Sequence, residues 1–187
     1  MATGINFLSP YFPLIKNKDI LLIQQKTGNL LSLFTNKNID WLNLEWHETN
    51  KRILHKKTRT GIEVTLKFLK ENPHLTQGDI LYEDTETIIA VDIQSCDAIV
   101  IKPKNNFEIA AICYEIGNKH LPLFFHDDEL LIAFENPLFN LLTSLEYDVK
   151  KETRKLLNPL KTSVASHAHN NSESLFSRIL KVSNYQP

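Results

Sequence analysis

The chain has 187 residues and is almost neutral, with 21 basic and 22 acidic side chains and a formal net charge of −1. This length is enough for a sizeable core, in one domain or in two small ones. The balanced charge argues against a nucleic-acid-binding protein, which needs a basic excess to neutralise phosphates.

The apolar runs and the cysteines indicate the compartment. No apolar run approaches the roughly 20 residues that cross a bilayer, so no membrane segment is expected. Met1 to Pro13 has no basic residue ahead of its apolar positions and does not resemble a secretory signal. Cys96 and Cys113 form no C-x-x-C pair and are expected to be reduced thiols. We therefore expect a soluble, cytoplasmic protein.

The first half of the chain has the pattern of short β-strands. Residues 52–58 and 62–69 flank the turn signal Arg59-Thr60-Gly61 and are predicted to pair as a hairpin. Further strands, each bounded by polar or turn residues, are expected over 20–24, 41–46, 80–82 and 87–93. Short strands of this kind indicate a small sandwich or a partly closed barrel.

The pattern changes after Ile93. Strands are expected over 98–101, 123–125, 130–134 and near Val149, and helices from about Phe107 and from Pro137. The order βαββαβ is that of a ferredoxin-like sandwich, with helices on one face of an antiparallel sheet. The predicted fold class is therefore α+β. An N-terminal all-β domain is expected in 1–94 and a ferredoxin-like domain in 95–160. A flexible histidine-containing tail is expected in 161–187, which lacks apolar periodicity.

The first predicted helix leads to a histidine in a short loop. Residues at three- and four-residue spacing give this helix an apolar face, namely Phe107, Ala110, Ala111 and Tyr114. Gly117 is expected at the helix C-cap in the left-handed conformation, and Pro122 prevents the helix from resuming. His120 is then held beside the partial negative charge of a helix end, which favours a cation. A metal ligand and a loop histidine hydrogen-bonded to a carbonyl both fit this position.

The second predicted helix has a start signal and an apolar stripe. Asn136 is expected as its N-cap, with Pro137 as the first helical residue. Its apolar stripe consists of Leu138, Leu141, Leu142 and Leu145.

The other potential ligands form no metal motif. His167 and His169, separated by one residue, can approach a common ion or can belong to a merely polar tail. His126 stands among acidic residues and is predicted to lie in a solvated hairpin turn. Three further histidines are expected to be exposed, namely His47, His55 and His74. Cys113 is expected to be a small buried residue, and no Gly-rich phosphate loop or nucleophile elbow is present.

Five motifs follow one another along the chain. They are Trp41-Leu42-Asn43-Leu44-Glu45-Trp46, Lys51-Arg52-Ile53-Leu54, Thr58-Arg59-Thr60-Gly61, Gly78-Asp79-Ile80-Leu81-Tyr82 and Tyr114-Glu115-Ile116-Gly117-Asn118-Lys119-His120-Leu121-Pro122-Leu123. In this order they resemble the UreE family of urease accessory proteins, over about residues 18 to 145. The stretch from Gly117 to Leu123 is the specific element, whereas the Arg-Thr-Gly and Gly-Asp elements alone are weak.

The resemblance implies a homodimeric nickel metallochaperone that helps to load the urease active site. It also implies partner or peptide binding by the N-terminal β domain (1–94) and metal binding and dimerisation by the ferredoxin-like domain (95–160). In the family, the histidine matching His120 is the principal nickel ligand, and two copies meet across the dimer axis. His167 and His169 are similar in placement to the C-terminal histidines that complete or supplement that site. The implied partners are the accessory GTPase UreG and apo-urease with other urease accessory proteins. Zinc and copper satisfy similar imidazole sites, so nickel is implied by the family and not by the residues.

Two other classes of function stay open at this stage. One is a protein-binding scaffold, in which residues 20–93 recognise urease subunits and metal binding is incidental. The other is an enzyme built on His120 and nearby acids. Residues 134–136, which hold further histidines in some family members, contain none here, so about one ion per dimer is expected. A dimer and a tetramer both remain open, and residues 1–17 match no part of the family pattern.

Overall fold

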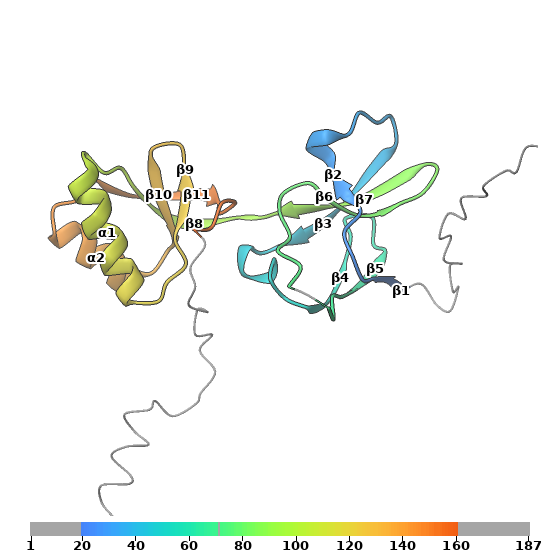
Figure 1. Cartoon of the computed structure of the whole chain (residues 1–187), viewed down its shortest axis with the longest axis horizontal. Coiled ribbons are helices and arrows are strands. Elements are labelled where there is room, and N and C mark those ends of the chain that lie inside the picture. Colours follow the sequence, from blue (N-terminus) through green and yellow to red (C-terminus); the bar gives the residue numbers. More distant parts are fainter. Residues whose placement is uncertain (1–19, 71, 161–187) are drawn as a thin grey trace, which may run out of the picture. The chain divides into compact units, whose positions relative to one another are not determined.

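The computed structural model describes residues 20–70 and 72–160 (Figure 1). The chain divides into two compact units after Gln94, and this residue alone separates the last strand of the first unit from the first strand of the second.

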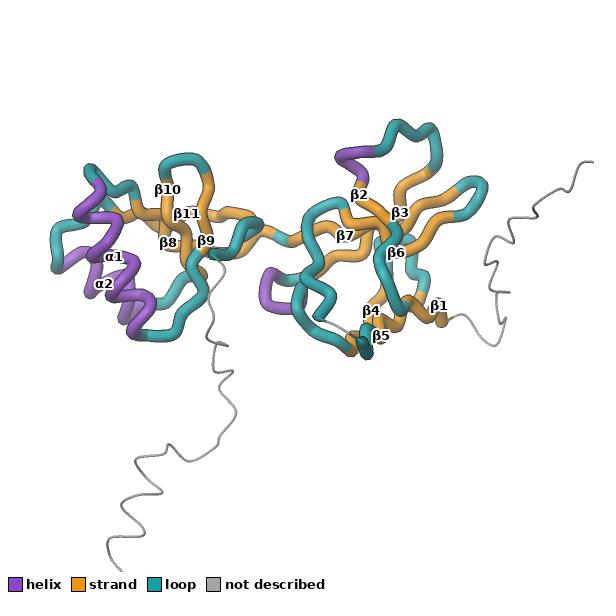
Figure 2. Tube along the Cα trace, in the orientation of Figure 1, coloured by secondary structure: helices purple, strands orange, loops and turns teal. Residues whose placement is uncertain are grey.

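The N-terminal unit consists of strands and two single-turn 3-10 helices (Figure 2). One sheet has the order β1-β5-β4 and contains Ile20–Ile23, Glu63–Lys67 and Ile53–Lys57. The other has the order β2-β6-β7-β3 and contains Gly28–Asn29, Asp79–Glu83, Thr87–Ile93 and Asn38–Leu44. The 3-10 helices are η1, Leu30–Ser32, and η2, Trp46–Glu48. The first half of the chain is therefore sheet-rich, as predicted.

The predicted hairpin is present, since β4 and β5 pair in antiparallel register from Ile53↔Lys67 to Lys57↔Glu63. The strand expected over 41–46 is displaced. It begins at Asn38 and ends at Leu44, because Glu45 and Glu48 form a reciprocal capping box that turns Trp46 into η2.

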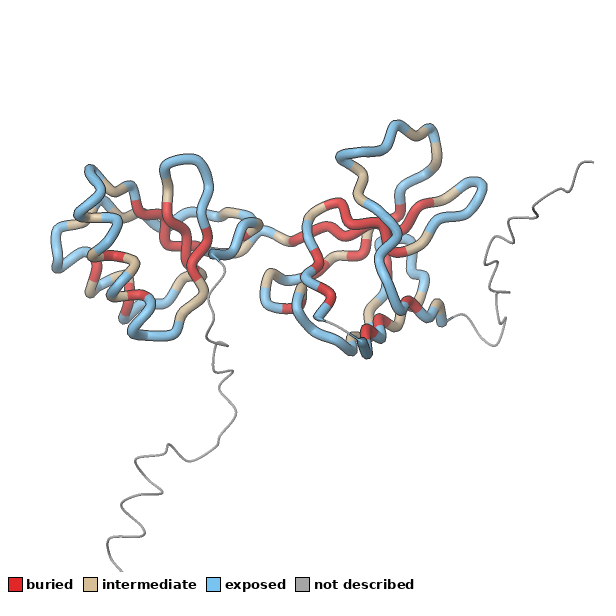
Figure 3. The backbone as a smooth tube through the Cα atoms, in the orientation of Figure 1, coloured by how far each residue is buried: buried red, intermediate tan, exposed pale blue. Residues whose placement is uncertain are grey.

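The core of this unit is centred on β7, which lies between β6 and β3. Residues Ile88 to Ile93 are all buried, which is the continuous apolar pattern of an interior strand (Figure 3). In β3 burial alternates instead, with Asp40, Leu42 and Leu44 inside. This core gives the unit a rigid frame on which its loops are mounted.

The C-terminal unit has the predicted βαββαβ order. Its elements are β8 (Ser95–Ile101), α1 (Asn106–Asn118), β9 (Phe124–His126), β10 (Glu129–Ala133), α2 (Asn136–Ser144) and β11 (Val149–Lys155). The strands form an antiparallel sheet in the order β11-β8-β10-β9, and both helices cover one face of it (Figure 1). The ferredoxin-like prediction is confirmed. In the part of the chain that the structure describes, no helix is long and apolar enough to cross a membrane.

The apolar face predicted for α1 is not the face that packs on the sheet. Ile112 and Ile116 are buried there, together with Ile99 and other core residues. Phe107 is 82% exposed and Tyr114 is 70% exposed. Apolar residues occur on two sides of α1, and helical spacing alone cannot decide which side meets the sheet. The prediction was wrong, and the outcome leaves an aromatic face on the surface.

The prediction for α2 is largely right. Leu138 and Leu142 are buried and Leu141 is half-buried, whereas Leu145 lies beyond the last turn and is exposed. The expected N-cap is wrong by one residue, because Asn136 is already helical and Glu135 is the extended cap residue. Pro137 lies in the first turn, where its missing N–H costs no hydrogen bond.

Candidate metal centre

Two hydrogen bonds close the end of α1 and place His120 itself in the left-handed conformation. The N–H of His120 donates to the Gly117 carbonyl at 3.0 Å, and the N–H of Leu121 donates to the Ile116 carbonyl at 3.4 Å. This is the pattern of a Schellman motif, in which the residue after the cap is left-handed. His120 occupies that position with a φ of 54°.

The expectation that Gly117 is the left-handed cap is therefore wrong. Gly117 lies within α1, and a Cβ built on it meets no atom within 4 Å. The helix continues to Asn118 because its end is set by packing: Leu121 is half-buried against the core cluster that contains Ile116. A contact of this kind accompanies the Schellman motif, and here it puts the turn three residues later than the glycine suggests.

A left-handed non-glycine residue carries a steric cost of about 1–2 kcal/mol. Such residues persist where surrounding structure imposes them, and they gather at functional sites. α2 ends in the same way, with Glu146 at a φ of 60° and hydrogen bonds from Glu146 to Thr143 and from Tyr147 to Leu142. Both α1 and α2 thus end with a left-handed residue. This conformation alone does not identify His120 as a ligand.

The backbone on the far side of His120 is anchored. Pro122 is half-buried, and Leu123 and Phe124 are buried as the chain enters β9. His120 is exposed between this anchor and the end of α1. The imidazole is therefore presented to the surface from a loop that is fixed at both ends, which suits a ligand that must both take up and release an ion.

After β11 the chain pairs with the start of β9, close in sequence to the loop that contains His120. Phe124 and Pro159 form an antiparallel bridge, the Phe125 N–H donates to the Asn158 carbonyl at 3.0 Å, and the Leu160 N–H donates to the Leu123 carbonyl at 2.8 Å. Because the pairing is antiparallel, the chain at Leu160 is directed along β9 backwards, toward Pro122 and His120. His167 and His169 lie outside the described residues.

Within residues 20–70 and 72–160, no three His, Cys, Asp or Glu side chains come together as a metal site. His126 is the last residue of β9, just before the β9–β10 turn in which it was predicted to lie; it is exposed, and its Nδ1 atom lies 3.3 Å from the Asp127 carboxylate. The other three described histidines are exposed, namely His47, His55 and His74. Cys113 is half-buried, and burial raises the pKa of its thiol, which disfavours the thiolate that metals bind.

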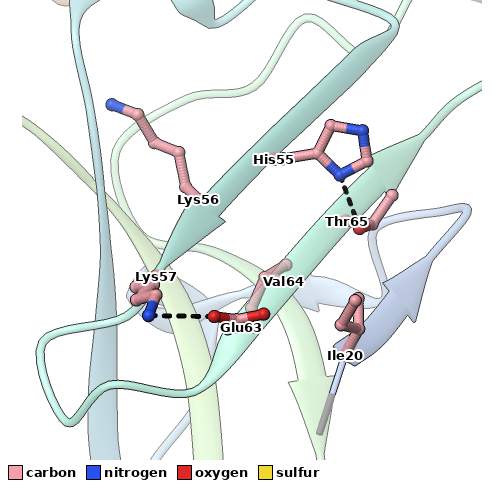
Figure 4. Close-up of a pocket in the computed structure, with 7 residues that line it drawn as sticks. All are labelled: Ile20, His55, Lys56, Lys57, Glu63, Val64 and Thr65. Carbon is pink, nitrogen blue, oxygen red and sulfur yellow. Dashed lines mark hydrogen bonds and ion pairs between the residues drawn. The ribbon is translucent and has the colours of Figure 1, made fainter. Parts of the chain in front are cut away.

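A shallow hollow on the outer face of the β1–β5–β4 sheet contains His55 and carries no chemistry of its own (Figure 4). The His55 Nδ1 atom lies 2.8 Å from the Thr65 hydroxyl, and Lys57 pairs with Glu63 at 2.9 Å. These polar groups satisfy one another across neighbouring strands.

The motifs of the N-terminal unit hold its frame together. Arg59 pairs with Asp92 on β7, donates to Asn43 at 3.0 Å and lies over the Trp41 ring. Asp79 accepts hydrogen bonds from Lys26, Asn29 and the Thr76 N–H. Asp79 is 3% exposed, so these partners offset the cost of burying its carboxylate. The sequence placed Arg59 in a turn and both Arg59 and Asp79 in the family pattern; in the structure their contacts hold the N-terminal unit together.

Two family models match consecutive parts of the chain. The UreE urease accessory protein N-terminal domain matches residues 23–94, and the UreE urease accessory protein C-terminal domain matches residues 96–175. The chain belongs to the UreE family of urease accessory proteins, and these are accessory proteins and not enzymes.

Individual relatives agree with this assignment. The urease accessory protein UreE of Flavobacterium johnsoniae is 44% identical over 163 residues, which are 87% of this chain and 99% of the relative. A UreE protein of Haemophilus influenzae is 36% identical, covering 86% of this chain and 85% of its own length. One from Acetivibrio thermocellus is 33% identical, covering 81% of this chain and 99% of its own length. The match therefore extends over both units.

The geometry at the end of α1 predicts that two substitutions each stabilise the protein. Gly117→Ala should raise the free energy of unfolding by about 0.5–1 kcal/mol, because alanine is the better helix former and the space is open. His120→Gly should raise it by about 1 kcal/mol, because glycine relieves the left-handed strain. Urea unfolding of the metal-free protein measures both. A loss of stability in Gly117→Ala would place the left-handed residue at Gly117 and reject this description.

Proposed function

We propose that this protein binds nickel at a dimer interface and delivers it, in the cytoplasm, for assembly of the urease active site. The proposal places nickel binding and dimerisation in the C-terminal unit and contacts with partner proteins in the N-terminal unit. The observation that carries it is the position of His120, exposed on a loop fixed at both ends, in a chain of the UreE family.

One imidazole per chain is too few for a nickel site, and two-fold symmetry supplies the second. In an isologous dimer the same residue of each subunit lies at equal distance from the axis, so a residue near the axis meets its own copy. The exposed aromatic face of α1 supports an interface there. Phe107, Ala110 and Tyr114 lie on one side of the helix that leads to His120, and all three are exposed.

Two imidazoles, with water or tail histidines, form a ligand set that suits nickel. Ni(II) accepts nitrogen and oxygen ligands in square-planar or octahedral geometry. Zinc and copper bind similar imidazole sites, so the preference for nickel rests on the family. An exposed site of this kind exchanges ligands more readily than a buried cage, which fits a carrier whose metal is cargo.

The return of the chain to β9 supports a role for the tail. His167 is seven residues beyond Leu160, and each residue spans at most about 3.4 Å, so His167 lies within about 24 Å of Leu160 along the chain. His169 has a slightly longer reach. His120 lies three residues before Leu123, the partner of Leu160. We propose that His167 or His169 covers the ion and withdraws when an acceptor supplies its own ligands.

The proposed acceptors are the accessory GTPase UreG and apo-urease with its other accessory proteins. The alternative is a scaffold of the urease maturation complex in which metal binding is incidental. The carrier and the scaffold differ in whether metal must bind first. A carrier needs bound metal for a productive encounter with its partner, and a scaffold does not. Retention of partners by a metal-free protein at unchanged affinity would favour the scaffold.

The first prediction concerns His120. Calorimetric titration of the full-length protein should give about one nickel ion per dimer, and His120→Ala should abolish this binding. His126→Ala is the matched control, because His126 is also exposed and lies at the other end of β9 from the His120 loop. Equal nickel affinity in wild type and His120→Ala would reject His120 as the main ligand.

The second prediction concerns the aromatic face of α1. Phe107→Ser together with Tyr114→Ser should convert the dimer to a monomer and should weaken nickel binding at least tenfold, because each site then loses one imidazole. Sedimentation velocity measures the mass, and Leu145→Ser, an exposed leucine just after α2, is the control. A stable dimer in the double variant would place the interface elsewhere.

The third prediction concerns the tail. Removal of residues 161–187 keeps the pairing of Leu160 with Leu123, so it should leave the dimer intact. It should also speed nickel release to a chelator, because the proposed tail ligands are gone. Stopped-flow release measures the rate, and the double variant His167→Ala/His169→Ala in the full-length chain separates the imidazoles from tail length. Unchanged release in both proteins would remove the tail from the mechanism.

A further inference from the structure

The N-terminal unit has an apolar loop with large side chains that are exposed and take no part in the core of the unit. Residues 30–34, called the apolar loop here, read Leu-Leu-Ser-Leu-Phe and connect β2 to the approach to β3. Leu31 is 93% exposed, Phe34 is fully exposed, and Leu33 is also exposed. Burying one such side chain is worth about 1.5–3 kcal/mol, so this exposure is a considerable loss for the isolated chain.

The apolar loop is held in place at its start. Leu30 packs against the buried cluster of Ile80, Ile88 and Ala90, and its N–H donates to the Gly78 carbonyl at 2.9 Å. The Asn29 side chain accepts a hydrogen bond from the Leu31 N–H at 2.9 Å and donates to Asp79 at 3.0 Å. The exposed leucines are thus presented from an anchored turn.

The chain just after the apolar loop is held against the β6–β7 hairpin by Lys37 and Asn38. The Lys37 ammonium pairs with Glu83 at 2.7 Å and donates to the Asp84 carbonyl at 2.5 Å, and the Asn38 N–H donates to the Glu86 carbonyl at 2.8 Å. A preformed loop loses little conformational entropy when it binds, which is a property of interface anchors.

The hairpin beside the apolar loop is acidic. Glu83, Asp84 and Glu86 are exposed at its tip, and Lys37 offsets only one of these charges. Hydrogen bonds from the backbone N–H groups of Glu86 and Thr87 lower the pKa of Asp84, so that carboxyl is ionised at neutral pH. An apolar anchor with an acidic rim complements an apolar pocket with a basic rim, and the same charge opposes binding to an anionic lipid surface.

We infer that the apolar loop docks on a partner protein, inserting Leu31 and Phe34 into an apolar pocket that is bordered by Lys or Arg side chains. The identification of that partner as a protein of urease assembly rests on the proposed function. The docking surface itself does not involve His120 or nickel. Three features support this docking surface: two large side chains are exposed, the turn that presents them is anchored, and the adjoining hairpin is acidic.

The test measures binding of the full-length chain to purified apo-urease and to purified UreG by interferometry. Leu31→Ser/Phe34→Ser should weaken binding to one of them at least tenfold. Leu69→Ser is the matched control, since Leu69 is exposed in the same unit but lies after β5, outside the apolar loop; it should change binding less than twofold. Glu86→Lys should slow association and reduce its dependence on salt.

Further measurements test the inference independently. Thermal melting should be unchanged in Leu31→Ser/Phe34→Ser, because both side chains are exposed, and its nickel stoichiometry should equal that of wild type. Equal partner affinity in wild type and this variant would overturn the inference while leaving the nickel proposal intact. Absence of wild-type binding to both proteins would also overturn it. So would wild-type binding to phosphatidylcholine–phosphatidylserine vesicles, or self-association, that the double variant loses.

Discussion

The contact of Leu121 with the core cluster around Ile116 determines where the second unit can present a ligand. The two residues lie on either side of the end of α1, and their packing requires the chain to reverse within the intervening residues. His120 is carried into the left-handed position by that reversal. Its exposure follows, because Ile116 and Leu121 pack into the core while the residues between them form the reversal at the surface. A loosely ended helix would leave the same imidazole on an unfixed loop.

The fold could be predicted wherever a sequence pattern is compatible with only one local structure. The β4–β5 hairpin follows from its turn signal, and the βαββαβ order follows from the alternation of apolar strands with helical spacing. The parallel pairing of β3 with β7 joins segments about fifty residues apart, and no local pattern reports it. The boundaries were harder to predict, because the capping box at Glu45 depends on side-chain geometry and the cap at Glu135 on backbone conformation, and neither follows from composition.

The candidate site was predictable only in part. The position of His120 behind a helix and before a proline could be predicted, whereas the left-handed residue was assigned to Gly117 because glycine is the usual occupant. The position of the left-handed residue is determined by a tertiary contact of Leu121. Residue spacing in the sequence does not predict tertiary contacts. The buried face of α1 was misassigned for the same reason. Ile112 and Ile116 fill the space above the sheet, and the aromatic residues do not.

Under the proposed function, the pairing of Leu160 with Leu123 makes the C-terminal tail a tethered ligand. A group attached to the same chain within a few tens of ångströms acts at an effective concentration of the order of millimolar, independent of how dilute the protein is. The second imidazole of a symmetric dimer obeys the opposite rule, because it is present only as far as subunits associate. Under the proposed function, dilution would therefore remove the imidazole of the second subunit, whereas the ligands on the tail would remain. Metal retention would then depend on protein concentration in two separable stages.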